Sequence, residues 1–161
     1  MKIRDRIKEL RRVRASELVP HAKNWRVHSK AQADALRGLL AEVGYADALL
    51  ARELPDGQLQ LIDGHLRAET TPNLSVAVLV LDVSEEEADK LLLTLDPLAG
   101  MAETDAARVA QLLATVRTDS EAVGALLERI AGTAGWQGLS SLVLGNTPEP
   151  QLDRAVELQK K

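Results

Sequence analysis

Residues 61–69 constrain the fold more than any other part of the chain, because an apolar strand runs into a glycine and then into a helix. A helix start offers unpaired backbone N–H groups and the positive end of the helix dipole, and Gly64 lets an anion approach the backbone closely. Arg67 adds a planar, charged donor group. The pattern therefore predicts a phosphate-binding turn. The alternative is an ordinary structural corner in which Arg67 forms a salt bridge with Glu69 or another neighbour.

Composition limits the classes of protein to which the chain can belong. Its 161 residues are 45% hydrophobic and 27% charged, which predicts one globular domain with an appendage. Aromatic residues make up only 2%, too few for the stacking surfaces of single-strand nucleic-acid readers, so Trp25 and Trp136 are interpreted as packing anchors. The absence of cysteine excludes disulfides, thiolate metal sites and cysteine nucleophiles. With no long apolar run or secretory signal, we expect a cytoplasmic protein without membrane contact.

The first 30 residues are strongly basic, with ten Lys and Arg against three acidic residues, although the whole chain has a net charge of −4. Within residues 2–14, apolar side chains recur at helical spacing, at Ile3, Ile7, Leu10 and Val13. We therefore expect an amphipathic helix over residues 1–14. Its candidate contacts to DNA phosphates are Arg4, Lys8, Arg11 and Arg12. The alternative is a solvated helix that packs on the body of the protein or on a partner.

Residues 15–97 alternate between predicted strands and helices. Caps, turn residues and hydrophobic periodicity predict an extended segment over 17–20, a helix over 30–43, a hairpin of strands 48–53 and 58–63, a short helix over 65–70 and a strand over 75–83. A capping box at Ser84 and Glu87 predicts a last helix, which Asp96-Pro97 should end.

From residue 98 onward the pattern becomes helical and then irregular. Residues 104–116 and 120–131 predict two helices, so residues 98–132 are expected to form a helical hairpin. Residues 133–161 begin with a segment rich in Gly, Ser, Thr and Pro and are expected to form a loop or linker with a short terminal helix.

Several short motifs follow one another in an order that a known family shares. Leu18-Val19-Pro20, Asn24-Trp25-Arg26, the helix over 30–43 and the glycine-led strand after Gly44 all occur in that order. Here the chain resembles the ParB/sulfiredoxin-like domain, also described as the ParB N-terminal-like nuclease domain. The phosphate motif of many ParB members, Gly-Glu-Arg-Arg, falls on Gly64-His65-Leu66-Arg67.

Two further segments, over residues 62–69 and 91–98, look like a ParB-like module that precedes DNA-modification methyltransferases. In such proteins a segment like residues 155–161 leads into the methyltransferase, so the chain would be a piece of a longer protein. The resemblance implies an α/β fold of the α+β kind, with a small mixed sheet, helices and a following helical hairpin. It also implies DNA and a linked or partner DNA methyltransferase as partners, and it leaves a homodimer open.

The resemblance implies a nucleotide triphosphate, CTP or ATP with Mg²⁺, as the ligand. Its phosphates would contact Gly64, His65 and Arg67, while Asn24 and Arg26 would bind the triphosphate or sugar end. Asp63 would lie near the magnesium ion through water. Leu66 and His65 replace an arginine and a glutamate of the family motif, which weakens the case for CTP hydrolysis and clamp behaviour. The sulfiredoxin reaction is excluded, because it needs a cysteine.

His65 has three possible roles: a protonated phosphate ligand, a general base in catalysis, or a buried side chain bonded to the backbone. A metal trio of His21, His28 and His65 lacks the spacing of known sites. Two functions remain open. One is a nucleotide-binding module, with weak NTPase or nuclease activity as its catalytic form. The other is a non-catalytic accessory domain that docks a methyltransferase on DNA.

Overall fold

The computed structural model describes residues 1–133, which belong to two compact units. The first unit comprises Met1–Glu103 and the second begins at Thr104, and each is described by itself. The linker expected over residues 133–161, apart from Thr133, lies outside the described residues, as does Trp136.

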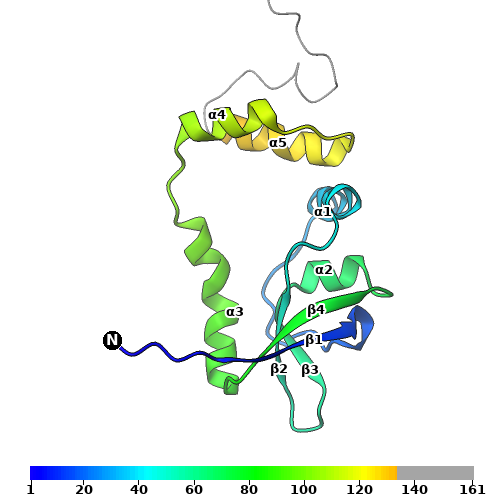
Figure 1. Ribbon diagram of the computed structural model, residues 1–161, viewed down its shortest axis with the longest axis vertical. Helices are drawn as coiled ribbons and strands as arrows, with labels where there is room; N and C mark the ends of the chain where they lie inside the picture. The colour runs from blue at the N-terminus through cyan, green and yellow to red at the C-terminus, as the bar shows by residue number, and fades with distance from the viewer. Residues whose placement is uncertain (134–161) are drawn as a thin grey trace, which may run out of the picture. The chain divides into compact units, whose positions relative to one another are not determined.

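The first unit is built on a four-stranded mixed sheet with the strand order β1-β4-β2-β3 (Figure 1). The strands are β1 (Ile7–Arg14), β2 (Leu49–Glu53), β3 (Leu59–Asp63) and β4 (Ser75–Leu81). Strand β2 runs parallel to β4, whereas β1 pairs with β4, and β2 with β3, in antiparallel fashion. Together with the helices, this mixed sheet confirms the predicted α+β class and the predicted hairpin.

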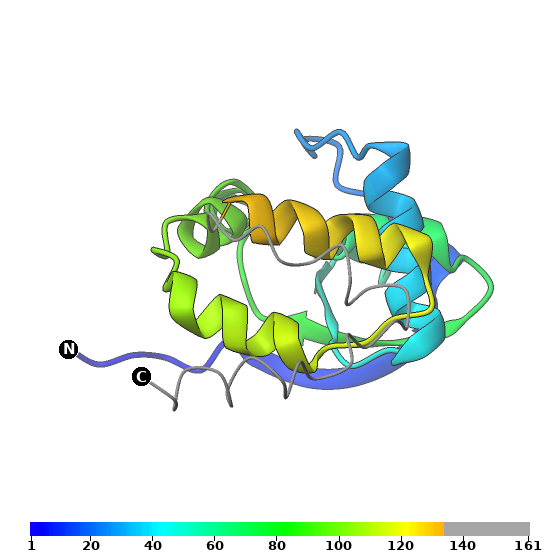
Figure 2. The ribbon, with the colours of Figure 1, turned by 90° about the horizontal axis from the view of Figure 1, so that it is seen from above.

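The prediction of an amphipathic helix over residues 1–14 is wrong, because residues 7–14 form the edge strand β1. Its backbone pairs along nearly the whole of β4, with Val13 opposite Val76 and Arg11 opposite Val78. This long ladder is a non-local interaction that overrides the local helical spacing. Of the four apolar residues that suggested a helix, only Val13 packs against the core, whereas Ile3, Ile7 and Leu10 are exposed. The edge position of β1 can be followed in Figure 2.

The helices of the first unit are a 3₁₀ turn η1 (Ala15–Glu17), α1 (Lys30–Glu42), α2 (His65–Thr70) and α3 (Glu85–Gly100). Helix α1 begins where predicted, with Ser29 Oγ accepting the N–H of Gln32 at 3.1 Å. Helix α3 has the predicted capping box but does not end at Asp96-Pro97. It continues to Gly100, since a proline removes only one hydrogen bond and a helix can resume beyond it.

In the extended segment expected over residues 17–20, Glu17 ends the η1 turn, whereas Leu18 has extended backbone angles and Val19 forms an isolated parallel bridge with Gln60. The turn helps to close the main core, which lies on one face of the sheet under η1 and α2. That core contains Ala15, Leu18, Leu49, Ala51, Leu59, Leu61, Ala68, Val76, Val78 and Val80. Because α2 packs over this core, the turn that leads into it is held in place by the sheet.

Over residues 104–133, the second unit forms two consecutive helices, α4 (Ala106–Thr115) and α5 (Glu121–Thr133). Leu113 and Ala131 are buried between them, with Val109 and Leu127 packed against this small core. Asp105 caps α4 by accepting the N–H of Arg108 at 3.1 Å. Within residues 1–133, every helix is too short or too polar to cross a membrane.

Candidate functional site

A pocket of about 300 Å³ lies beside the turn between β3 and α2. Its wall contains polar and charged side chains from three separate parts of the first unit. The wall includes every residue predicted to bind nucleotide or metal: Asn24, Arg26, Asp63, Gly64, His65 and Arg67. The remaining wall is largely apolar, with Leu36, Ile62, Leu66, Leu91, Leu92 and Leu95. The lining of the pocket thus combines charged and apolar side chains.

Gly64 shapes the turn for a reason that lies in the core. Its φ of 97° is in the left-handed region, which side chains rarely adopt. A Cβ atom added there would lie 2.5 Å from Cγ of Leu49, which is fully buried in the sheet. The glycine is therefore required by the turn and by core packing, so its presence alone does not indicate an anion.

Arg67 is held between two carboxylates at the edge of the pocket. Its Nη2 lies 3.0 Å from Oδ2 of Asp63, and its Nη1 pairs with Asp47 in the segment before β2. Its side chain is only 17% exposed, and Tyr45 Oη donates to its carbonyl oxygen at 3.0 Å. The hydrogen bond from Arg67 lowers the pKa of Asp47. The salt bridge considered for Arg67 exists, but with these partners in place of Glu69.

Arg26 reaches the pocket from the segment between η1 and α1. Its guanidinium pairs with Asp96 of α3 and lies 5.0 Å from the centre of the Trp25 ring. Asn24 Oδ1 accepts the backbone N–H of Arg26 at 3.3 Å, which tightens the local turn. The indole N–H of Trp25 donates to the carbonyl of Leu92 at 3.2 Å. This hydrogen bond ties the turn to α3, but the Trp25 side chain is 51% exposed and lies outside the core.

His65 adopts the third of its expected roles. It is buried, and its Nε2 accepts the backbone N–H of His21 at 3.1 Å, so its proton is assigned to Nδ1. Burial lowers the pKa of His65, which keeps the ring neutral near pH 7. This geometry disfavours the protonated form, since the Nε2 lone pair is already occupied, and contact between His65 and a phosphate stays a prediction.

His21 continues the same hydrogen-bonded network toward Asn24. Its Nδ1 accepts the N–H of Lys23 at 3.2 Å, and its carbonyl accepts the N–H of Asn24 at 3.0 Å. Burial lowers the pKa of His21, and its Nε2 lies 3.4 Å from Oδ1 of Asp89. The ring of His65 thus fixes His21, and His21 fixes the segment that carries Asn24 and Arg26.

Within residues 1–133, no three His, Asp or Glu side chains gather closely enough to hold a metal ion by themselves. The trio of His21, His28 and His65 is therefore wrong as a metal site. Asp63, the predicted magnesium contact, has one carboxylate oxygen committed to Arg67. Its carboxylate could still contact a Mg²⁺ ion whose ligands are mostly phosphate oxygens, because Mg²⁺ on a nucleotide needs only one or two protein carboxylates.

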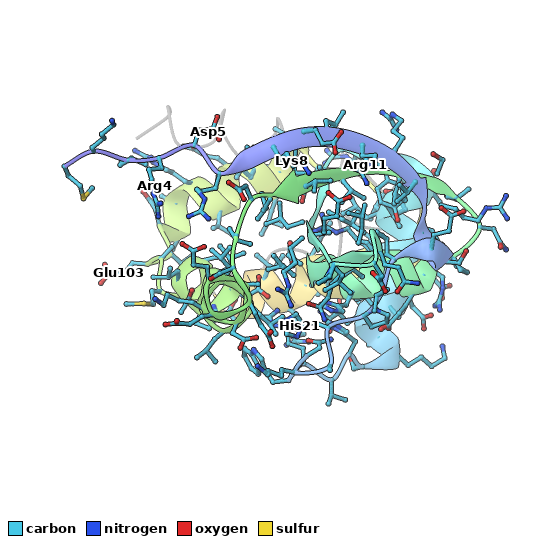
Figure 3. The ribbon with its side chains drawn as sticks, turned by 90° about the horizontal axis from the view of Figure 1, so that it is seen from below. Arg4, Asp5, Lys8, Arg11, His21 and Glu103 are labelled. Atoms are coloured by element: carbon cyan, nitrogen blue, oxygen red, sulfur yellow. The ribbon has the colours of Figure 1, made fainter. Side chains whose placement is uncertain are left out.

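The basic residues predicted to contact DNA lie apart from this pocket. Figure 3 shows Lys8 and Arg11 along β1, well separated from His21. Lys8 Nζ lies 2.8 Å from Glu53, Arg11 pairs with Glu9, and Arg4 lies 3.6 Å from Glu87. Arg12 is exposed. DNA contact by these residues stays a prediction, as does association with a DNA methyltransferase.

Three important charged residues were missed in the sequence. Asp47 and Asp96 pair with the pocket arginines from positions 20 and 70 residues away in the chain. Arg6 forms a two-pronged contact with Glu87, at 2.8 Å for each N–O pair, and its Nε donates to the carbonyl of Asp82 at 2.6 Å. No local pattern marks these pairings, since each joins elements that meet only in the folded unit.

No model of a protein family matches the chain, and no curated protein matches it in sequence. Among solved structures, it is similar to the C-terminally truncated chromosome-partitioning protein ParB from Caulobacter crescentus complexed with CTP-γ-S. The identity is 19%, the TM-score is 0.50, and the match covers 80% of this chain and 72% of that one.

Two further solved structures match with lower TM-scores. One is a Pnob8-like ParB-N domain, with 19% identity and a TM-score of 0.44, and the match covers 78% of this chain and 49% of that one. The other is the C-terminally truncated Caulobacter crescentus ParB complexed to the centromeric parS site, with 17% identity and a TM-score of 0.42, and the match covers 94% of this chain and 80% of that one. The match to the CTP-γ-S complex shows a ParB-like fold, as the sequence predicted.

Proposed function

From the ParB-like fold of this chain, we propose that its first unit binds a nucleotide triphosphate in the pocket at the β3–α2 turn. One observation carries the proposal. Two arginines and an asparagine from distant parts of the chain, Arg26, Arg67 and Asn24, line a single pocket with the glycine turn. The ParB of Caulobacter crescentus, which has a similar fold, is complexed with CTP-γ-S. CTP is therefore the first nucleotide to test, with ATP as the comparison.

The charged side chains of the pocket suit the phosphates. Arg26 and Arg67 each present a planar guanidinium, which can donate two parallel hydrogen bonds to phosphate oxygens. Their side chains are 30% and 17% exposed, so bulk solvent screens their charge less than that of a surface arginine.

The apolar side chains of the pocket suit the base and sugar of the nucleotide. Leucine side chains from α1, α2 and α3 line the pocket, and the amide of Gln32 and the ring of His28 supply polar groups. Ligand pockets commonly combine such an apolar wall with a few polar groups that fix orientation. Inorganic phosphate would leave this wall without a partner, which favours a nucleotide as the ligand.

When bound with the nucleotide, Mg²⁺ would neutralise phosphate charge. Asp63 is the carboxylate suited to reach it, directly or through water. The proposed activity is binding without turnover. His65, the catalytic candidate, is neutral, and its Nε2 already accepts a backbone N–H, so it is not available as a general base.

The test is isothermal titration of the full chain with CTP and ATP, in the presence and absence of Mg²⁺. Arg67→Ala should weaken CTP binding by about 10- to 100-fold, because a hydrogen bond to a charged group contributes about 1.5–3 kcal/mol. Arg37→Ala is the matched control, since Arg37 pairs with Asp34 on the exposed side of α1 and does not line the pocket. Equal affinities of the two variants, or no saturable binding at millimolar nucleotide, would overturn the proposal.

A further inference from the structure

We propose that Asp47 is an internal anion that occupies Arg67 in the nucleotide-free protein and restricts the site to polyphosphates carrying a divalent cation. This inference rests on the proposed function and names the class of ligand that the pocket selects. It begins from the two carboxylates that hold Arg67.

The two carboxylates are held to very different degrees. Asp63 is the last residue of β3, and its side chain is 39% exposed. Asp47 lies outside any helix or strand, and its side chain is 74% exposed. An exposed ion pair contributes little free energy, because water and salt can replace either partner. Asp47 is therefore the carboxylate that an incoming anion displaces.

Arg67 itself is suited to exchange one anion for another without moving far. Its side chain is 17% exposed, and its backbone lies in α2, whose packing on the core is maintained by Ala68. Tyr45 further fixes it by donating to its carbonyl oxygen. The guanidinium thus stays at the edge of the pocket while the carboxylate of Asp47 moves away.

The balance of charge shows which anion can make this exchange. Arg26 and Arg67 are the basic side chains of the pocket wall, and Asp63, Asp96 and Asp47 pair with them. Within the wall, Asp63 and Asp96 balance the two guanidinium groups, and Asp47 adds a third carboxylate next to the wall, so no net positive charge attracts a bare anion. A phosphate that replaces Asp47 also meets the carboxylate of Asp63, which repels it unless a cation lies between them. The pocket therefore favours a metal-complexed polyphosphate over inorganic phosphate or a nucleoside monophosphate.

The experiment compares Asp47→Asn with Asp34→Asn in the full chain. Asp34 is a matched control, because it is an aspartate outside the pocket that pairs with Arg37 and Lys30 on α1. The dissociation constants of CTP, CMP and pyrophosphate are measured by calorimetry with and without Mg²⁺, and thermal unfolding verifies that both variants are folded. Asp47→Asn should tighten CTP binding several-fold, with the largest gain in the absence of Mg²⁺, whereas Asp34→Asn should have no effect.

The outcomes separate this inference from the proposed function. If the unmodified chain binds CTP but Asp47→Asn does not tighten it beyond Asp34→Asn, the role of Asp47 is overturned and the nucleotide site stands. The same holds if the unmodified chain binds CMP or metal-free pyrophosphate as tightly as Mg²⁺-CTP. If neither the unmodified chain nor Asp47→Asn binds any of the three ligands, both proposals fall.

Discussion

The pocket and the edge strand β1 both contain arginines that pair with carboxylates, but those of the pocket come from distant segments and line one cavity, whereas those of β1 follow one strand. Arg26 and Arg67 come from segments far apart in the chain, and both are partly buried where they meet at one cavity. On β1, Lys8 is 54% exposed and pairs with Glu53, and Arg12 is exposed. Partial burial does not separate the two regions, because Arg11 is 33% exposed and Arg26 30%; what distinguishes Arg26 and Arg67 is that both line one cavity.

The largest effect is expected at the turn that supports the pocket. Gly64→Ala forces a side chain into a left-handed conformation, at a cost of about 1–2 kcal/mol, and drives a Cβ atom against Leu49, which adds about 1–3 kcal/mol. We expect a loss of about 3 kcal/mol in the free energy of unfolding, measured by urea denaturation.

Gly57→Ala provides the matched control for this substitution. Gly57 also has a positive φ, of 84°, but nothing lies within 4 Å of the Cβ that alanine would add. Its cost should be limited to the backbone term of about 1–2 kcal/mol. Equal losses for the two variants would mean that the turn is not held against the core as described.

The next effect concerns the buried network that positions Arg26. His65→Leu removes the acceptor of the His21 N–H and leaves that donor buried without a partner, which should cost about 1–3 kcal/mol in the free energy of unfolding. His65→Gln keeps an oxygen that can accept the same N–H and should recover much of this loss. Tryptophan fluorescence of a Trp136→Phe background would report the environment of Trp25 in both variants. A glutamine variant as destabilised as the leucine variant would count against the hydrogen bond as the cause.

Next to β1, the contact between Arg6 and Glu87 predicts that the stability of the protein depends on pH. The hydrogen bond from Arg6 lowers the pKa of Glu87 from 4.5 to about 2. Because the folded-state pKa is the lower one, the stabilisation is present above pH 4.5 and is lost as the pH falls toward 2. Glu87→Gln should therefore lower Tm by a few degrees at pH 6, and the difference from the unmodified chain should shrink at pH 2 to 3.

Glu86→Gln is the control for this dependence on pH. Glu86 is in the same first turn of α3 and is exposed, so it shares the helix dipole with Glu87. Its substitution should change Tm little at either pH. If both substitutions give the same pH profile, the dipole and not Arg6 is responsible.

The contrast between the two regions also explains what the sequence could and could not predict. The helix that starts after Ser29, the hairpin around Gly57 and the turn at Gly64 depend on local signals, and the structure confirms all three elements. Strand β1 depends on β4, which is distant in the chain, and its apolar spacing happened to match a helix. The partners of the pocket arginines, Asp47 and Asp96, were missed for the same reason, because a carboxylate on another element leaves no trace in local spacing.

The smallest effect is expected for Arg12 on β1, and it sharpens the distinction between the two regions. Arg12→Ala should change the free energy of unfolding by no more than about 0.5 kcal/mol, since an exposed surface residue without a structural role contributes little. CTP affinity should be unchanged in the calorimeter, in contrast to Arg67→Ala. If β1 contacts DNA phosphates, the same substitution should lower the slope of log affinity against log salt by about one, because one fewer counterion is released. A loss of CTP affinity in Arg12→Ala as large as that in Arg67→Ala would mean that convergence on the pocket does not distinguish the two arginines.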